Sequence, residues 1–177
     1  VSNAMYGIYY NKTLMEEHGW ELPSDFAQLE ALCRDIRAEG LIPGVLGAQL
    51  TGSVFSAVFN LAKTGWLTTP AGRAWERDFL AGEATAAGAW EDTMAYTQRL
   101  IDAGFFTTDP EDRDNKTLFF DYLGGRRAVF FTAAMTVNLT ELPDTGDQLG
   151  MMPYIGEHGD KNIYMYSPAY YFGISKR

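Results

Sequence analysis

Tyr6-Gly7-Ile8-Tyr9-Tyr10-Asn11-Lys12 is the stretch that decides the fold of this 177-residue chain. Its aromatic and β-branched residues predict a short strand. Asn11 is a residue type that caps helices, so the spacing predicts a helix over 13–18, and Gly19 stands where that helix must end. The chain therefore begins with a strand that is followed at once by a helix.

The next helix is predicted after Pro23, over residues 24–40. Its apolar residues recur at helical spacing, and Asp25 with Gln28 three residues later has the form of a capping box. Beyond it we expect a strand at 41–46, then helices over 55–62, 70–80, 87–103 and 116–123, and then strands at 128–132, 149–152, 162–166 and 170–174. The inward residues are expected to be Phe55, Val58, Phe59 and Ala62 in the first of these helices, and Trp90, Met94, Leu100 and Ile101 in the third.

This order of elements limits the fold class. One strand, a continuous block of helices and then several strands indicate an α/β or α+β chain. The length fits one domain or one large lobe with a sizeable core. Composition and periodicity distinguish no further.

Charge and composition exclude several function classes. The net charge is −9 and no dense cluster of Lys and Arg occurs, so nucleic-acid binding is not expected. No apolar run approaches the roughly 20 residues of a membrane-spanning helix. Cys33 is the single cysteine, which rules out an internal disulfide, and its place on an apolar helix face predicts a small core residue.

No catalytic or cofactor motif stands out. His18 and His158 have no acidic neighbours at metal-ligand spacing, and neither a Gly-x-Ser-x-Gly elbow nor a phosphate-binding loop is present. Gly124-Gly125-Arg126-Arg127 is interpreted as a surface turn with solvated arginines. We expect no enzyme, no cofactor and no metal; a carbohydrate-active enzyme with a pair of acids remains an alternative.

Aromatic residues make up 14% of the chain and include ten tyrosines. Several stand near the first and last predicted strands, among them Tyr9, Tyr166 and Tyr170. Aromatic faces stack on the C–H surfaces of sugars, and phenol groups add hydrogen bonds. Packing in the core explains each of them equally well.

Three segments in order resemble extracellular solute-binding protein family 1, which includes maltose-binding protein. The first is residues 6–12 with the helix after Pro23. The second is Leu100-Ile101-Asp102-Ala103-Gly104-Phe105-Phe106, followed by Gly125-Arg126-Arg127-Ala128-Val129. The third is Met152-Pro153 with Gly173-Ile174-Ser175-Lys176. The similarity extends over essentially the whole chain.

The resemblance implies the type II periplasmic-binding-protein fold, an α/β architecture of two lobes joined by hinge strands. Residues 1–6 are then a hinge strand, residues 7–147 the C-terminal ligand-binding lobe, and residues 148–177 the crossover and the strands that return to the other lobe. Residues 148–153 make the crossing, and residues 154–177 belong to that other lobe, most of which is missing. The chain is thus expected to be a fragment, with Ser2-Asn3-Ala4 either a cloning scar or a natural mid-chain segment.

The resemblance also points to solute-contacting residues. The turn at 49–55 matches a segment of the family that faces the sugar, which makes Ser53 and Phe55 candidates. Met135 stands where the family often has a tryptophan that stacks on the sugar, and this departure weakens a carbohydrate assignment. Tyr166 and Tyr170 are candidates for the missing aromatic platform, and Tyr9 is the remaining candidate.

The function implied is that of the solute receptor of an ABC importer, with a sugar or oligosaccharide as solute. Binding is by hinge closure without chemistry. The expected partners are the solute and the membrane permease, for a protein that is monomeric at full length. The expected location is extracytoplasmic, in the periplasm or lipid-anchored on the outer face of a Gram-positive membrane. An interaction or sensory lobe without transport function is the other alternative.

Overall fold

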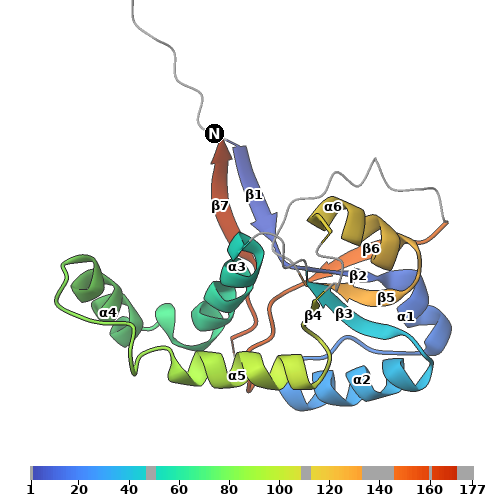
Figure 1. Cartoon of the computed structure of the whole chain (residues 1–177), viewed down its shortest axis with the longest axis horizontal. Coiled ribbons are helices and arrows are strands. Elements are labelled where there is room, and N and C mark those ends of the chain that lie inside the picture. Colours follow the sequence, from blue (N-terminus) through green and yellow to red (C-terminus); the bar gives the residue numbers. More distant parts are fainter. Residues whose placement is uncertain (1, 47–50, 109–112, 133–145, 160, 171–177) are drawn as a thin grey trace, which may run out of the picture.

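A mixed five-stranded sheet forms the centre of the molecule (Figure 1). The computed structural model describes residues 2–46, 51–108, 113–132, 146–159 and 161–170. The strand order is β4-β3-β5-β2-β6; β3 is parallel to β4 and β5, and β2 is antiparallel to β5 and β6. The strands are β2 (Ile8–Asn11), β3 (Ile42–Leu46), β4 (Thr107–Thr108), β5 (Ala128–Phe131) and β6 (Leu149–Met152).

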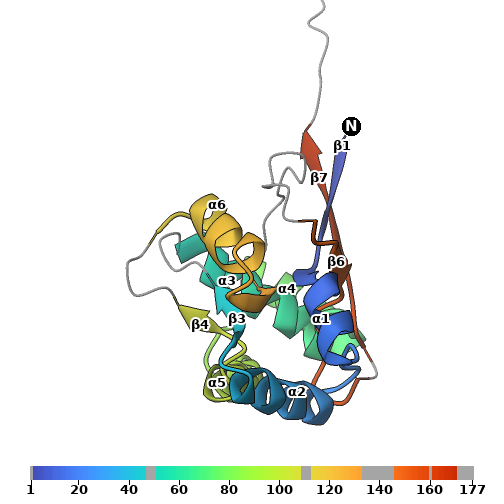
Figure 2. The same cartoon turned by 90° about the vertical axis from the view of Figure 1, so that its right-hand side faces the viewer.

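A two-stranded ribbon projects from one end of this sheet (Figures 1 and 2). It pairs β1 (Ser2–Tyr6) with β7 (Met165–Tyr170) in antiparallel register. Gly7 joins the ribbon to the sheet, and a Cβ atom there would lie 2.7 Å from the carbonyl oxygen of Met152. Glycine is therefore required where the chain passes from the ribbon into β2.

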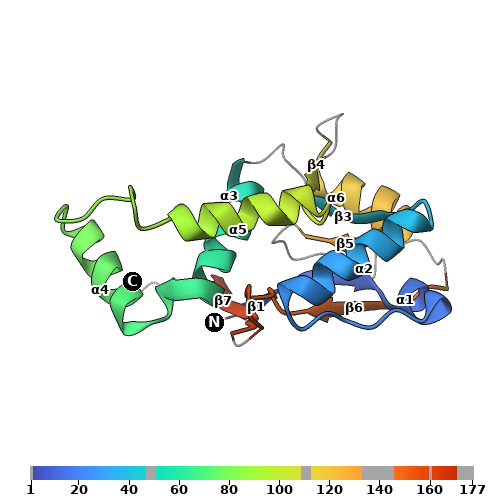
Figure 3. The ribbon, with the colours of Figure 1, turned by 90° about the horizontal axis from the view of Figure 1, so that it is seen from below.

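Helices cover both faces of the sheet. In Figures 1 and 3, α2 and α5 lie along one face, α6 lies on the other, and α4 stands far from the sheet at the end of an arm. The helices are α1 (Lys12–His18), α2 (Phe26–Ala38), α3 (Thr51–Ala62), α4 (Pro70–Leu80), α5 (Glu91–Asp102) and α6 (Asn115–Leu118), and two π-helical segments, η1 (Lys63–Leu67) and η2 (Phe119–Gly124), continue α3 and α6.

The core lies on both faces of the sheet, against α2 on one side and against α6 with η2 on the other. All four residues of β5 are fully buried, as expected of a strand with neighbours on both sides and cover on both faces. The apolar face of α2 is the predicted one: Phe26, Leu29, Leu32, Cys33 and Ile36. The prediction that Cys33 is a core residue is confirmed.

The ends of the first two helices also follow the prediction. The Leu14 amide donates to Oδ1 of Asn11 at 2.9 Å, and Gly19 ends α1 with a φ of 67°. Asp25 caps α2 by accepting from the Gln28 amide at 2.9 Å. The predicted capping box is only half formed, because Oε1 of Gln28 accepts from the Ser24 amide instead of the Asp25 amide. The Gln28 side chain reaches Asp25 through its other end, where Nε2 donates to Oδ2 of Asp25 at 3.3 Å.

The predicted inward face of α5 was right at Leu100 and wrong at Met94 and Ile101. The helix begins at Glu91 instead of residue 87, and its buried residues include Thr93, Tyr96 and Leu100, whereas Met94 is 54% exposed. The rotation follows from Tyr96, whose ring meets Phe26 edge-on with centroids 5.6 Å apart. Its hydroxyl donates to the carbonyl of Ile155 at 2.9 Å, which places this side of α5 against the core.

The face predicted for α3 was likewise wrong, except at Ala62. Ala57, Leu61 and Ala62 are its buried apolar residues, so small side chains allow the helix to approach the core. Phe55 and Phe59 stack on each other on the outer side, with centroids 5.6 Å apart. The larger aromatic residues therefore lie outside the main core.

The chain after β6 differs from the expected division. β6 pairs with β2 inside the sheet, and Tyr154 then forms a bridge with Ile163. Asn162 donates from Nδ2 to the carbonyl of Ser24 at 2.7 Å. The described residues of the range 154–163 hence pack against this lobe. The ribbon strand β7 begins at Met165, whereas a strand was predicted to begin at residue 162. Of the strand expected at 170–174, only Tyr170 lies within the described residues.

Candidate functional site

The residues predicted to contact solute lie on three elements of the described structure. Ser53 lies in the first turn of α3, with Phe55 two residues further along. Tyr166 and Tyr170 lie in β7, where Met5 pairs with Tyr166. Met135 lies outside the described residues.

Tyr9 occupies a different environment from the other candidates. It lies in β2, is 6% exposed, and meets the ring of Phe119 edge-on at a centroid distance of 5.4 Å. Since its ring is enclosed by the core, it has no surface to offer a solute. From the sequence alone, Tyr9 could have been a core residue or a solute-contacting residue. In the structure it packs in the core.

Among the candidates whose side chains the structure describes, Phe55 and Tyr166 are the exposed aromatic residues, at 61% and 67%. The elements that carry them, α3 and β7, both lie at the end of the sheet from which the ribbon projects (Figures 1 and 3). Two exposed rings are thus held at the same end of the molecule. The two rings lie at the same end of the sheet, but one is carried by α3 and the other by β7.

A row of aromatic rings supports Phe55 from behind. Phe59 stacks on Phe55 and lies 6.2 Å from Trp90, whose ring in turn lies 6.0 Å from Trp75. Trp75 then stacks on Phe79 at 4.9 Å. The row fixes the orientation of Phe55 and leaves the ring itself accessible, which suits a surface for apolar sugar faces.

The sequence carried a signal for this row that was not used. Phe55 and Phe59, like Trp75 and Phe79, are four residues apart, a spacing that places side chains one above the other on a helix. Lys63 lies over the other side of Phe59, with its Nζ atom 4.2 Å from the ring centroid. Burial lowers the pKa of Lys63, and nearby Glu76 opposes that shift.

The turn at 124–127 is more than a solvated surface turn. Arg126 adopts a φ of 56° and forms ion pairs with Glu17 and Asp147, the second at 3.1 Å. Asp147 also accepts from Nδ2 of Asn11 at 2.7 Å. The arginine therefore ties the last turn of α1 to Asp147 before β6, and Asp147 in turn holds the N-cap residue of that helix.

The described residues contain neither a candidate metal site nor a candidate membrane-spanning helix. There, no group of three or more His, Cys, Asp and Glu side chains is placed to hold a metal ion. Nor does any helix in the described ranges have the length and apolar character to cross a membrane.

Comparison with solved structures identifies the fold of the chain, whereas comparison of its sequence identifies no family. Neither a family model nor a curated protein matches the chain. Among solved structures, a sugar transporter from Bacillus licheniformis in complex with stachyose is 16% identical, with a TM-score of 0.69 over 93% of this chain and 43% of the other. The apo form of RafE from Streptococcus pneumoniae is 18% identical, with a TM-score of 0.64 over 93% and 42%.

A third solved structure, from a study of xylan utilisation by Caldanaerobius polysaccharolyticus, is 20% identical, with a TM-score of 0.66 over 93% and 42%. The chain thus spans less than half the length of the structures it matches. At this level of identity the similarity establishes the fold. The predicted α/β fold of a solute-binding protein lobe is confirmed.

Proposed function

We propose that this chain is one lobe of the sugar-binding receptor of an ABC importer, and that it binds a sugar or oligosaccharide by hinge closure. The observation that carries the proposal is the structural match over 93% of the chain to a sugar transporter bound to stachyose. RafE in complex with raffinose gives the same coverage at a TM-score of 0.67. These neighbours are binding proteins, which favours a role without covalent chemistry.

The proposed solute surface consists of Phe55 and Ser53 on α3, Tyr166 and Tyr170 on β7, and Met135. Phe55 supports this assignment because its ring is exposed and is backed by Phe59. A rigid, half-exposed aromatic ring loses little conformational freedom when a sugar stacks on it. Tyr166 supplies a second exposed ring at the same end of the molecule.

The hinge of this proposal is the β1–β7 ribbon. On one side β1 continues through Gly7 into β2 of the five-stranded sheet, and on the other β7 follows the bridge between Tyr154 and Ile163. In the proposed receptor the ribbon leads to the second lobe, which brings the remaining contacts. Solute then holds the closed arrangement because it touches both lobes only when they meet.

Partners and location follow from the same proposal. A receptor of this kind delivers its solute to the permease subunits of the importer, outside the cytoplasm. We expect the two-lobe protein to act as a monomer, because closure around the solute needs no second copy.

A thermal-shift screen tests the proposed class of ligand. The two-lobe protein containing this chain is heated with mono- and oligosaccharides, amino acids and polyols in turn. A sugar that binds only the folded state raises the midpoint by mass action, and at a hundredfold excess over Kd it contributes about 2.7 kcal/mol. Shifts confined to sugars are expected. If no compound raised the midpoint of unfolding, the result would favour an interaction or sensory lobe instead.

The Phe55→Ala variant tests the assigned surface in the same screen. We expect it to reduce the stabilisation by sugar by up to about half, because a pair of aromatic rings is worth about 0.5–1.5 kcal/mol beyond burial and stacking on a sugar is expected to be of similar size. Phe79→Ala is the matched control. Phe79 is also an exposed ring of the aromatic row, but it lies on α4, at the end of the row opposite to Phe55. Equal losses in the two variants would overturn the assignment of Phe55.

A further inference from the structure

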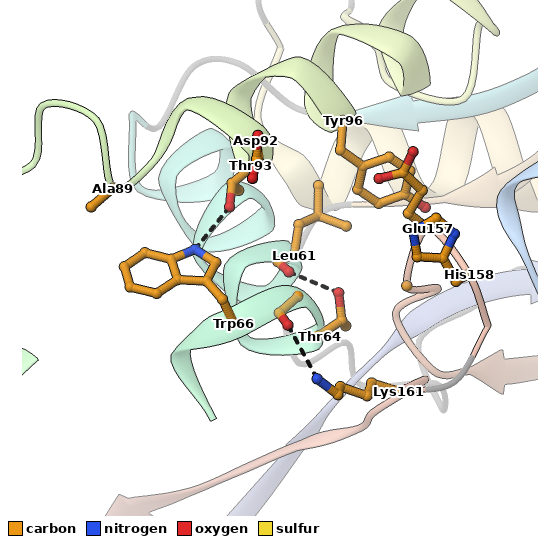
Figure 4. Close-up of a pocket in the computed structure, with 12 residues that line it drawn as sticks. Leu61, Thr64, Trp66, Ala89, Asp92, Thr93, Tyr96, Glu157, His158 and Lys161 are labelled. Carbon is orange, nitrogen blue, oxygen red and sulfur yellow. Dashed lines mark hydrogen bonds between the residues drawn. The ribbon is translucent and has the colours of Figure 1, made fainter. Parts of the chain in front are cut away.

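A separate cavity of about 290 Å³ lies between the end of α3, the segment η1, the start of α5 and residues 156–161 (Figure 4). Leu61 from α3, Thr64 from η1, and Thr93 and Tyr96 from α5 contribute to its lining. The volume is at the lower end of the roughly 300–1,000 Å³ of small-molecule pockets. An occupant must therefore be small.

This cavity is distinct from the proposed solute surface. Phe55 lies near the start of α3, whereas Thr64 comes nine residues later, in η1. At about 1.5 Å per residue these positions are separated by roughly 13 Å along the helix axis. Phe55 and Tyr166, the residues of the solute surface whose side chains the structure describes, do not line the cavity.

Hydrogen bonds hold the lining in place without a ligand. Trp66 donates from Nε1 to Oγ1 of Thr93 at 3.1 Å, and its ring meets Trp90 edge-on at 5.9 Å. Thr64 donates its hydroxyl proton to the carbonyl of Leu61 at 2.7 Å, and Tyr96 donates to a backbone carbonyl as described above. Each of these hydroxyl groups retains lone pairs that can accept from a ligand.

The charges around the cavity balance. Asp92 and Glu157 contribute two carboxylates, Lys161 contributes an ammonium group, and Arg99 forms an ion pair with Glu157. His158 adds a ring that both donates and accepts. A lining whose charges cancel offers donors and acceptors to a neutral molecule and gives no net attraction to an ion.

Asp92 is the group most open to a ligand. It is exposed in the first turn of α5, and no hydrogen-bond partner for its carboxylate is recorded in the part of the chain that the structure describes. Figure 4 shows Asp92 and Lys161 on opposite sides of the cavity, with Trp66 forming a further wall. A ligand with several hydroxyl groups that lies between them can donate to the carboxylate of Asp92 and accept from the ammonium group of Lys161.

We propose that this cavity is a second small-molecule site, which binds a neutral, hydroxyl-rich molecule the size of one sugar ring. Hydroxyl groups donate to Asp92 and accept from Lys161, and the ring lies beside the indole of Trp66. The site uses none of the proposed solute-contacting residues, so the two proposals stand or fall separately.

Two-dimensional ¹H–¹⁵N NMR of the 177-residue chain tests this site. The neutral probes are D-glucose, D-galactose and myo-inositol, and L-serine is the zwitterionic probe. We expect a saturable shift of the Trp66 indole N–H and of the Thr93 and Gly156 amides with at least one neutral probe. The amide of Phe55 is expected to remain unchanged at the same concentrations.

Asp92→Asn and Glu91→Gln form a matched pair for the titration. Each neutralises one carboxylate in the first turn of α5, but only Asp92 lines the cavity. We expect Asp92→Asn to weaken the response at Trp66 about tenfold, because a hydrogen bond to a carboxylate is charge-assisted. Glu91→Gln is expected to bind like the parent, and the spectra themselves report that both variants are folded.

Three outcomes overturn the proposal. One is the absence of a saturable shift at Trp66 with every neutral probe. Another is a response to L-serine alone, which assigns the cavity to a zwitterion. The third is equal weakening by both substitutions. Shifts at Phe55 without shifts at Trp66 would support the solute surface proposed above and refute this second site.

Discussion

At the level of single residues, Cys33 shows how burial alters chemistry. The side chain has no exposed surface, and burial raises the pKa of its thiol from 9.0 to about 12, while Arg37 acts in the opposite direction. The thiol therefore keeps its proton in the folded state at pH values where an exposed thiol has lost it. Its neighbours on α2 are Leu29, Leu32 and Ile36, which explains the loss of solvation.

Cys33 consequently makes the folded state less stable in alkali. Between pH 9.0 and about 12 the unfolded thiol ionises while the folded thiol does not, so the folded state binds more protons. The free energy of unfolding must then fall as pH rises through this window, by up to about 1.4 kcal/mol per pH unit from this group. The contribution is fully present below pH 9.

Urea unfolding of the parent and of Cys33→Ala from pH 8 to pH 11 measures this effect. The variant loses packing at every pH, but its stability should decline less steeply above pH 9. Burial also raises the pKa of Tyr154, to about 12, so both proteins retain some slope. Identical slopes would show that Cys33 ionises freely in the folded state.

The sequence predicted residues well where the chemistry is local. Asn11, Gly19 and Asp25 have roles set by their immediate neighbours, and each occupies the predicted position. Arg126 was misjudged, because its partners Glu17 and Asp147 are distant in sequence. Burial of Tyr9 behind Phe119 likewise depends on a contact that no local pattern contains.

At the level of helices and strands, the start of α2 gives the most specific prediction. Asp25 caps the helix through the Gln28 amide, and replacing such a cap with alanine costs about 1 kcal/mol. We expect Asp25→Ala to lower the free energy of unfolding by this amount. Asp35→Ala serves as the control, because Asp35 is an exposed acidic residue near the opposite end of the same helix.

Chemical denaturation monitored by far-UV circular dichroism compares the two variants. Asp35→Ala should be nearly neutral, since removing a negative charge near the end of a helix does not oppose the helix dipole. If Asp25→Ala proves as stable as Asp35→Ala, the cap contributes nothing and the helix is held by its apolar face alone.

The errors in α3 and α5 have one physical cause. Phe55 and Phe59 of α3 belong to the outer row of rings, and so does Trp90, the residue before α5, so these large apolar side chains do not mark the core-facing side. Small residues such as Ala57 and hydroxyl-bearing residues such as Thr93 occupy that side instead. The π-helical segments η1 and η2 had no signal in the sequence, because apolar periodicity does not distinguish them from the helices they continue.

At the level of the whole molecule, sequence order was a good guide to topology and a poor guide to boundaries. The strands predicted at 6–10, 41–46, 128–132 and 149–152 correspond to β2, β3, β5 and β6, which meet in one sheet. The division near residue 154 was not predictable, because Tyr154 and Ile155 are buried by residues from distant elements. Of the proposed solute surface, Phe55 was suggested by the family resemblance, and its helical spacing from Phe59 signalled their contact. The contact between Phe59 and Trp90 emerged only in three dimensions.

Isothermal titration calorimetry on two proteins decides whether this chain acts as one half of a closing receptor. The sugar that produces the largest thermal shift is titrated into the two-lobe protein and into the 177-residue chain alone. We expect the chain alone to bind at least about a hundredfold more weakly, because it keeps only part of the contacts and has no lobe to close against. Micromolar binding by the chain alone, equal to that of the two-lobe protein, would contradict hinge closure around a shared solute.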